Sequence, residues 1–441
     1  MTQYVCDQEH ISTFVIHKTK KSLHNTNRLF LLIQTEYGRK IIMRKPKICF
    51  LQYSLRGGGA ERKICTLANF FSNNGYEVEI GLFGINEIAY TLDDKVKVTF
   101  IDRSNYEYNT TLEKLGFQCK EKIEKFITHV SGLAGKKMKN KFQAHYYHKN
   151  NYTDPIRHFI ISRKNTVFIT MMYGTYLEIL HIMKPYWKDT IPVPYLVMEC
   201  NDPKRNANAQ MDKARTKNYV RATKVLAQTQ GAKNYFIPEI QQKCVVIPNP
   251  VRDDLPEPYS GNRRKIIVNY CRLNEQKNLP LLINAFAEFS KKHTDYKLEI
   301  YGEGALRSSL NKQIENLGIE DKAIIRSFDS NIHKRIRDYA MYVSSSDWEG
   351  FPNSVLEALA MGIPTISTDC DYGPRDMIRD HENGLLTPCG DISAMVKAMT
   401  ELAEDTELAE ALSKESVKVR DIYNVNRIGQ QWLDIIQEVA Q

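Results

Sequence analysis

Two glutamates that stand eight residues apart, Glu349 and Glu357, are the residues whose type and spacing most clearly suggest chemistry. Glu349 falls in a predicted loop with Gly350 and Pro352, and Glu357 falls in the first turn of a predicted helix that Asn353 is expected to cap. An ionised carboxylate has two acceptor oxygens, so the pair could hold neighbouring hydroxyl groups of a polyhydroxylated ligand. Taken alone, the pair also fits two ordinary surface glutamates, which are common.

Two cations, Arg272 and Lys277, lie between a predicted strand that ends at Tyr270 and a helix that is expected to begin near Asn278. A helix N-terminus carries partial positive charge, and two cations beside it favour an anionic group such as a diphosphate. Without further context, the same residues are equally compatible with a solvated basic loop.

The glycines Gly57–Gly59 stand between a predicted strand, Lys47–Tyr53, and a predicted helix, Ala60–Asn74. Glycine lets the backbone approach a phosphate group closely and direct its N–H groups at it. A glycine-rich turn of this kind is by itself as compatible with a simple tight turn as with a phosphate site.

Four segments in order along the chain carry these residues: Arg56–Arg62, Glu199–Pro203, Asn269–Asn278 and Ser344–Asp369. Together they resemble the retaining glycosyltransferases of family 4, which have the GT-B fold. The fourth segment contains the E-x7-E motif of that family, and in the second segment Cys200 stands where the family has an arginine. The resemblance extends roughly from residue 47 to the C-terminus.

The resemblance implies roles for the charged residues. Arg272 and Lys277 would bind the donor diphosphate, Glu349 would contact the hydroxyls of the donor sugar, and Glu357 would hold the ribose. Glu349, Arg272 and Lys277 are therefore the predicted catalytic residues, in a front-face mechanism that retains anomeric configuration. The predicted donor-binding residues are Gly58, Gly59, Arg272, Lys277, Glu349, Asn353 and Glu357.

The acceptor side is less clearly defined, because many relatives carry a histidine after the fourth strand of the first domain and this chain has none between Thr170 and Thr175. Tyr173 and Thr175 are the two candidates for that position. The predicted acceptor residues are Tyr173, Glu199 and Asp202.

The sequence Asp369-Cys370-Asp371 spells D-x-D, a metal motif of a different glycosyltransferase fold. We expect it to bind no metal, because Arg272 and Lys277 already supply the positive charge that a metal would bring. No metal site and no cofactor are predicted.

Alternation of short apolar strands with helices predicts parallel sheets covered on both faces, and hence an α/β protein. We expect a GT-B fold, with two Rossmann-like domains facing each other across a cleft. The predicted parts are a poorly structured extension (1–43), an acceptor domain (44–250), a proline-rich linker (251–264), a nucleotide-sugar donor domain (265–425) and a C-terminal helix that crosses back to the first domain (426–441).

The 441 residues are 42% hydrophobic and 26% charged, values typical of a globular protein. No uninterrupted apolar run is long enough to span a membrane, and the N-terminus does not resemble a signal peptide. The nine cysteines form no CxxC motif and have no regular spacing, which favours a reducing compartment. The expectation is a cytoplasmic protein, either free or peripheral on the cytoplasmic face of the membrane.

The positive charge is concentrated in residues 111–165, which hold 12 lysines or arginines against 4 acidic residues, within a chain of net charge +9. An apolar stripe that includes Ile123 and Phe126 accompanies the charge. We expect this segment to contact an anionic membrane or a lipid-diphosphate acceptor, or else to be a solvated surface helix. A nucleic-acid partner is not expected, because no nucleic-acid motif accompanies the charge.

These features predict transfer of a hexose or N-acetylhexosamine from a UDP- or GDP-sugar to a glycan acceptor. The acceptor would be linked to polyprenyl diphosphate, in a surface polysaccharide or oligosaccharide pathway. Two alternatives remain open: a nucleotide-sugar epimerase on a similar fold, and a non-catalytic protein that binds nucleotides or glycans.

Overall fold

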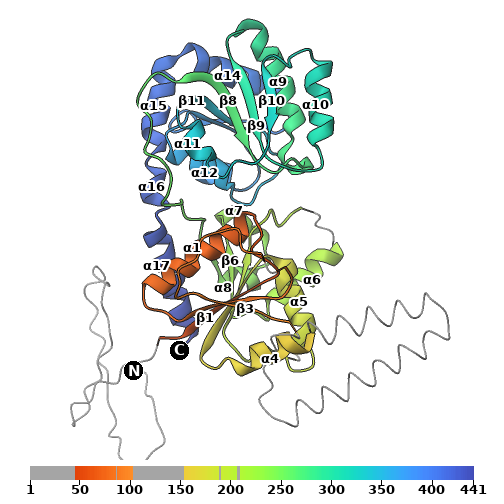
Figure 1. Cartoon of the computed structure of the whole chain (residues 1–441). Coiled ribbons are helices and arrows are strands. Elements are labelled where there is room, and N and C mark those ends of the chain that lie inside the picture. The colour runs from red at the N-terminus through yellow and green to blue at the C-terminus, as the bar shows by residue number, and fades with distance from the viewer. Residues whose placement is uncertain (1–44, 86, 103–152, 188–189, 206–208) are drawn as a thin grey trace, which may run out of the picture. The chain divides into compact units, whose positions relative to one another are not determined.

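The structure is a computed structural model that describes residues 45–85, 87–102, 153–187, 190–205 and 209–441 (Figure 1). The chain from Pro46 onward forms one compact unit. The predicted extension, residues 1–43, lies outside the described residues.

The first sheet has seven parallel strands in the order β3-β2-β1-β4-β5-β6-β7. Alternate residues of β1 belong to two different cores: Ile48 and Phe50 pack on one side, and Cys49 and Leu51 on the other. This alternation shows a sheet that is buried on both faces, as a parallel sheet requires. The strands are β1 (Lys47–Gln52), β2 (Val78–Leu82), β3 (Lys97–Phe100), β4 (Thr166–Met171), β5 (Tyr195–Glu199), β6 (Lys224–Ala227) and β7 (Cys244–Val246).

Helices cover both faces of this sheet and form with it the first lobe (Figure 1). Helix α1 buries Ile64, Leu67, Ala68 and Phe71, the face that its 3.6-residue periodicity predicts. It ends before Gly75, whose φ of 75° suits glycine. The helices of this lobe are α1 (Gly59–Asn73), α4 (Asp154–Ser162), α5 (Tyr173–Met183), α6 (Ala209–Tyr219), α7 (Gln230–Tyr235) and α8 (Pro238–Lys243).

The second sheet has six parallel strands in the order β10-β9-β8-β11-β12-β13. The sequence predicts five of these strands as apolar segments, at residues 265–270, 297–301, 323–327, 341–344 and 364–367. The sixth, β13, has only three residues, too few to show periodicity in the sequence. The strands are β8 (Arg264–Tyr270), β9 (Lys297–Tyr301), β10 (Ala323–Arg326), β11 (Tyr339–Ser344), β12 (Thr365–Thr368) and β13 (Leu385–Thr387).

Helices on both faces complete the second lobe, with separate cores on its two sides. Neighbouring residues of β11 again alternate: Met341 and Val343 pack into one core and Tyr342 into the other. The helices are the 3-10 helix η2 (Glu275–Lys277), α9 (Leu279–Lys292), α10 (Arg307–Asn316), α11 (Ile332–Ile336), α12 (Asn353–Ala360), α13 (Pro374–Met377), α14 (Ile392–Glu404), α15 (Thr406–Ser416) and α16 (Val419–Ile422). The predicted α/β class with two Rossmann-like sheets is confirmed.

The last helix, α17 (Val425–Val439), returns to the first lobe and lies beside α1 (Figure 1). Trp432 and Ile436 are fully buried in the core that α1 also lines. Gly429 touches the ring of Phe70 so closely that an added Cβ would lie 2.3 Å from it. The two connections between the lobes run side by side where Val251 N–H donates to the Tyr423 carbonyl at 2.8 Å.

The order of strands fixes where side chains converge. In each sheet the chain reverses its direction of winding at a central pair of strands, β1 and β4 in the first and β8 and β11 in the second. Loops that follow such a pair diverge to opposite faces and leave space for a ligand at the carboxyl ends of the strands. The segments after β1, β4, β8 and β11 carry Gly58, Tyr173, Arg272 and Glu349, respectively.

Most of the predicted basic segment, residues 111–152, lies outside the described residues, but its last part forms α4 and the turn after it. Ile156 and Phe159 are buried in the first lobe. Arg157 pairs with Asp154 at 2.8 Å, and Arg163 pairs with Glu79 at 2.9 Å. These two arginines therefore serve internal contacts. Among the helices that the structure describes, none combines the length and apolar character that crossing a membrane requires.

Candidate active site

The structure brings Lys277 and Glu349 into direct contact. The Lys277 ammonium lies 2.5 Å from Glu349 Oε1, and both side chains are largely buried. Ser346 Oγ donates to the same carboxylate oxygen at 2.7 Å, and Gln276 Nε2 donates to the other at 3.2 Å. A predicted cation and a predicted carboxylate thus form one charge-assisted, hydrogen-bonded unit.

Backbone contacts hold these two side chains in place. Asp347 N–H donates to the Gln276 carbonyl at 3.0 Å, and Ser345 Oγ donates to the Lys277 carbonyl at 2.8 Å. Asn278 adopts a left-handed conformation with φ of 38° and donates from its amide to Asp347 at 2.7 Å. The turn after β8 and the loop after β11 are therefore joined along their length, which fixes the relative position of Lys277 and Glu349.

Glu357 lies in a second charged cluster, made with residues from both lobes. Arg62, on α1, places a guanidinium nitrogen 2.5 Å from Glu357 Oε1. His333 Nε2 lies 2.8 Å from Glu357 Oε2, and the Tyr270 hydroxyl lies 3.3 Å from the same oxygen. Arg252 Nη1 approaches His333 Nδ1 at 3.3 Å. Because arginine only donates, Nδ1 accepts and Nε2 donates its proton to Glu357.

This environment keeps Glu357 ionised. Burial opposes the charged form, but the guanidinium of Arg62 and the hydrogen bond from His333 outweigh it and lower the pKa of Glu357 to about 2. A carboxylate held in this state is a permanent hydrogen-bond acceptor, as a ribose-binding role requires.

Two local predictions for this helix are wrong. Helix α12 begins at Asn353, and the residue before it, Pro352, has no side chain that can cap. The Asn353 amide oxygen instead accepts from Asn249 Nδ2 at 2.8 Å. Glu357 is the fifth residue of the helix and so lies beyond its first turn. Arg62 and His333, not the helix N-terminus, stabilise its charge.

The glycine-rich turn approaches the same region. Gly58 has φ of 145°, and its N–H donates to the Tyr90 hydroxyl at 2.9 Å, so this predicted phosphate-binding N–H already has a partner. At Gly59, an added Cβ would lie 2.8 Å from the Asn353 amide nitrogen. A side chain at position 59 would therefore have to displace the Asn353 amide, which lies where α1 approaches α12.

Arg272 is exposed at the turn after β8. Burial raises the pKa of Glu61, and the positive charge of Arg272 counteracts that rise. Burial also raises the pKa of Cys271 to about 12, while the charges of Lys277, Glu349 and Arg272 all act on that thiol. The charges of all three predicted catalytic residues therefore act on the end of β8.

Two of the predicted acceptor residues, Tyr173 and Glu199, lie in a common cluster. The Tyr219 hydroxyl donates to Glu199 at 2.9 Å, and its ring meets the Tyr173 ring edge-on at 5.3 Å. Burial raises the pKa of Glu199, and the charge of Arg215 partly offsets it. Glu199 thus has internal partners, which suits it to supporting the loop after β5. Its contact with an acceptor remains a prediction.

Asp202 and the D-x-D sequence lie on facing loops. Burial raises the pKa of Asp202, and Asp371 adds to that rise. Lys204, from the first lobe, pairs with Asp371 at 2.8 Å, and Arg375 pairs with Asp369 at 2.6 Å. Each carboxylate of the D-x-D sequence thus has a cationic partner.

Sequence reasoning missed several residues that contact the predicted ones. Arg62 and His333 hold Glu357, and Asn249 holds Asn353. Lys63 is buried, which lowers its pKa, and it donates to Asn249 Oδ1 at 2.9 Å. The charges of Arg62 and Lys63 directly after the glycine turn were the available signal, but nothing in the sequence identified their partners.

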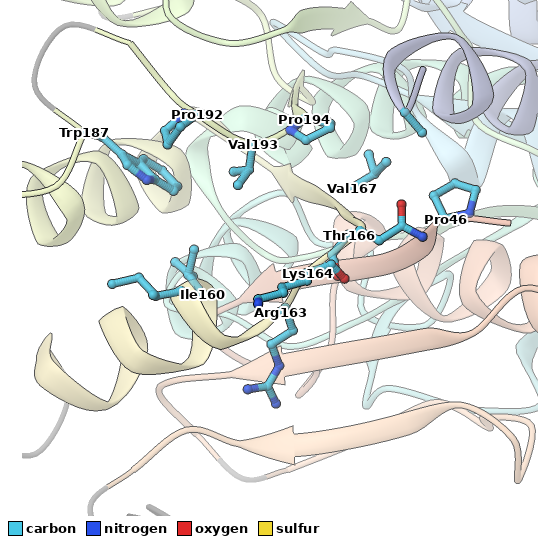
Figure 2. A pocket seen from close by; sticks show the side chains of 13 residues that line it. Pro46, Ile160, Arg163, Lys164, Thr166, Val167, Trp187, Pro192, Val193 and Pro194 are labelled. Carbon is cyan, nitrogen blue, oxygen red and sulfur yellow. The ribbon is translucent and has the colours of Figure 1, made fainter. Parts of the chain in front are cut away.

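A cavity of about 470 Å³ lies at the opposite end of the first sheet (Figure 2). Its lining includes Pro46, Thr166 and Pro194, which stand at the amino ends of β1, β4 and β5, together with Trp187. None of the predicted site residues lines it. The cavity is therefore separate from the carboxyl-end site.

Comparison with known proteins shows which proteins this chain is similar to. Residues 252–419 match the family of glycosyl transferases group 1. Two similar proteins come from Campylobacter jejuni. One is the GalNAc-α-(1→4)-GalNAc-α-(1→3)-diNAcBac-PP-undecaprenol α-1,4-N-acetyl-D-galactosaminyltransferase, 24% identical over 89% of this chain and 99% of the relative. The other is the N-acetylgalactosamine-N,N'-diacetylbacillosaminyl-diphospho-undecaprenol 4-α-N-acetylgalactosaminyltransferase. It is 26% identical over 85% of this chain and 94% of the relative.

Solved structures agree on the fold. A mutant of S. aureus TarM, crystallised with fondaparinux, α-GlcNAc-glycerol and UDP, has a TM-score of 0.68 at 15% identity and covers 89% of this chain and 100% of its own. Anabaena HepE, crystallised with UDP and glucose, has a TM-score of 0.63 at 17% identity and covers 89% of this chain and 100% of its own. The fold is GT-B. The family match and the full-length relatives show that the chain is a glycosyltransferase.

Proposed function

We propose that this chain is a retaining glycosyltransferase of family 4 that transfers a hexose, by preference an N-acetylhexosamine, from a UDP-sugar to a glycan linked to polyprenyl diphosphate. The observation that carries the proposal is the contact of Lys277 with Glu349 beside Arg272, at the point where the second sheet reverses its winding. The Campylobacter relatives support the acceptor class and the N-acetylhexosamine, since their names specify undecaprenyl-linked glycans and N-acetylgalactosamine. UDP in the neighbouring structures favours uridine over guanosine.

In the proposed reaction the bond between the anomeric carbon and the diphosphate oxygen breaks, and a bond to the acceptor hydroxyl forms on the same face of the sugar. The acceptor proton passes to the departing phosphate oxygen. Arg272 and Lys277 stabilise the negative charge that grows on the diphosphate, and contacts of this kind usually contribute most to the rate enhancement. Glu349 holds Lys277 in place and accepts hydrogen bonds from the sugar hydroxyls, and Glu357 accepts those of the ribose.

The proposal includes no metal ion. The two cations at the end of β8 supply positive charge where a metal would otherwise do so. Transfer should therefore proceed equally in a chelator and in added Mg²⁺. Loss of activity in the chelator, with recovery on adding metal, would contradict this part of the proposal.

The decisive experiment measures products with and without an acceptor. The purified chain is incubated with UDP- and GDP-activated hexoses and N-acetylhexosamines, with a polyprenyl-diphosphate-linked oligosaccharide as acceptor. We expect transfer from a UDP-N-acetylhexosamine, and an α-linked product from the α-configured donor. A β-linked product would contradict retention. Conversion of the donor without any acceptor would favour an epimerase, and tight UDP binding without turnover on any acceptor would favour a binding protein.

Contact between residues 111–165 and an anionic membrane also remains a proposal. The described part of that segment offers limited support, because Arg157 and Arg163 are engaged in internal ion pairs. Sedimentation with vesicles of neutral and of anionic lipid tests the idea. Equal binding to both kinds would remove it.

A further inference from the structure

Two cysteines that take no part in the proposed reaction, Cys370 and Cys389, lie opposite each other at the ends of neighbouring strands. Strands β12 and β13 pair with Ser367 against Leu386 and Thr368 against Thr387. Asp369 N–H continues this ladder by donating to the Thr387 carbonyl at 2.7 Å. The same register places Cys370 opposite Cys389, and their sulfur atoms are 3.9 Å apart.

This geometry suits a disulfide. Neighbouring strands lie about 4.8 Å apart, and the Cα atoms of a disulfide lie about 4.4–6.8 Å apart. The sulfurs need to approach by about 2 Å to reach bonding distance, which side-chain rotation can supply. Cys370 is buried and Cys389 is exposed, so a reagent in solution reaches Cys389 first.

We propose that Cys370 and Cys389 form a dithiol site that exchanges with small disulfides, such as oxidised glutathione. In the first step the Cys389 thiolate attacks one sulfur of the small disulfide, a mixed disulfide forms, and one thiolate leaves. In the second step Cys370 loses its proton and attacks the Cys389 sulfur, which closes the protein disulfide and releases the second thiolate. The protein loses two protons and two electrons, and the small disulfide gains them and becomes two thiols.

The surroundings of the pair support this order of attack. The contact between the two sulfur atoms lowers the pKa of the Cys389 thiol, while the same contact, together with burial, raises the pKa of Cys370. A lowered pKa increases the thiolate fraction that can attack. In a reducing compartment, disulfides formed this way are usually transient and redox-sensing.

The pair is connected to the donor site through one residue. The Cys370 thiol donates to the Ser346 carbonyl at 3.0 Å, and Ser346 Oγ donates to Glu349 at 2.7 Å. Cys389 lies 3.8 Å from the same carbonyl. Formation of a disulfide removes the Cys370 thiol proton, and with it the hydrogen bond that the Ser346 carbonyl accepts. Oxidation therefore loosens the loop that holds Glu349 against Lys277.

The experiment treats the full chain with oxidised glutathione and maps its cysteine peptides by mass spectrometry without reduction. We expect a linked peptide that joins Cys370 to Cys389, reversed by dithiothreitol. The Cys370→Ser variant should stop at the first step and accumulate a glutathionyl group on Cys389. The matched control Cys271→Ser, in the same lobe, should still form the linked peptide.

Two results would overturn the proposal. One is the absence of the linked peptide while Cys389 remains unmodified in the folded wild-type chain. The other is a glutathionyl group that persists on Cys389 of the wild-type chain, because it would show that Cys370 does not resolve it. Circular dichroism of each sample establishes that the chain stays folded during treatment.

The effect on the donor site rests on the proposed function and is measured separately. Complete oxidation should lower the rate of sugar transfer by at least about twofold, the scale of one lost hydrogen bond, and Cys389→Ser should be insensitive to the reagent. An unchanged rate in the fully oxidised chain would overturn the coupling to Glu349. If the reduced chain transfers no sugar, the proposed function fails. The peptide map still tests the dithiol site, because it does not depend on sugar transfer.

Discussion

Lys277 and Arg272 carry the same charge but stand in different surroundings, and this difference decides what their removal would do. The Lys277 ammonium is paired with a buried carboxylate at 2.5 Å, whereas Arg272 is exposed at the same turn. Removing Lys277 would leave Glu349 without its cation, and an orphaned buried charge is costly. Removing the exposed Arg272 would not leave Glu349 without its cation.

We therefore expect Arg272→Ala to lower the rate of sugar transfer about 10²- to 10³-fold with little change in unfolding temperature, since one preorganised charge contact is typically worth that much. Lys277→Ala should lower the rate to a similar degree and also reduce stability. Initial rates and thermal unfolding of each variant measure the two effects. Lys291→Ala, which removes an exposed lysine, is the control. Full activity in both test variants would refute the diphosphate assignment.

Glu357 makes stability depend on pH in a specific direction. Its pKa is lowered from the ordinary value of 4.5 to about 2, so its ionised form is favoured by folding. The stabilisation that follows is fully present above about pH 4.5 and is lost as the pH falls toward 2.

Urea unfolding of wild type and Glu357→Gln tests this direction. Their difference in unfolding free energy should be largest between about pH 5 and 7 and should shrink steadily at lower pH. The exposed Glu288→Gln variant should show no comparable trend. A difference that stays constant down to pH 3 would mean that the pKa of Glu357 is not lowered.

The sequence allowed a prediction of the charged residues of the candidate site. It did not allow a prediction of the residues that contact them. Lys277 and Glu349 stood in motifs whose residue types and order were informative. The partners Arg62 and His333 belong to distant segments, and only the folded chain brings them to Glu357. The predicted capping by Asn353 failed for the same reason, because its side chain bonds to Asn249 of the other lobe.

At the scale of elements, the turn between β1 and α1 depends on glycine for two separate reasons. Gly58 has a φ of 145°, which L-residues rarely adopt, and an added Cβ would lie 2.3 Å from the Glu61 carboxylate. At Gly59 the constraint is the close approach of Asn353. The turn is thus shaped by backbone conformation and by contact between α1 and α12.

We expect Gly58→Ala to destabilise the chain by about 1–3 kcal/mol, the usual cost of an unfavourable backbone conformation. Gly174 provides a matched control, because it lies in helix α5 with no atom near its absent Cβ and no unusual φ. Gly174→Ala should be neutral or slightly stabilising. Chemical unfolding of both variants makes the comparison. Equal stability of Gly58→Ala and wild type would show that the turn tolerates a side chain.

Strand and helix positions were mostly predictable, because parallel strands buried on both faces give continuous apolar runs and amphipathic helices give a clear period. Strand β9, Lys297–Tyr301, matches the predicted segment residue for residue. The three-residue strand β13 was missed because it forms only when β12 offers a neighbour. That missed strand also brings Cys389 beside Cys370.

At the scale of the whole molecule, the first lobe is completed by the last helix of the chain. Trp432 is fully buried among residues of α1 and the first sheet, and Gly429 lies against Phe70. Segments from the two ends of the described chain thus share one core.

Trp432→Ala should therefore destabilise the first lobe by about 3–5 kcal/mol, the usual cost of removing a large buried aromatic side chain. Hydrogen exchange should locate the loss in α1 and the first sheet, although the substitution lies at the other end of the sequence. The exposed Gln437, which donates to Tyr76, serves as a surface comparison on the same helix. Loss confined to the second lobe would contradict the shared core.

The position of α17 also has a consequence for biosynthesis. A ribosome releases residues in order, so the hydrophobic side of α1 emerges well before the helix that covers it, α17. During that interval a nascent chain presents Phe70 and its neighbours to the surrounding solution. A chaperone that recognises apolar segments would find its binding site there until α17 has emerged and folded against α1.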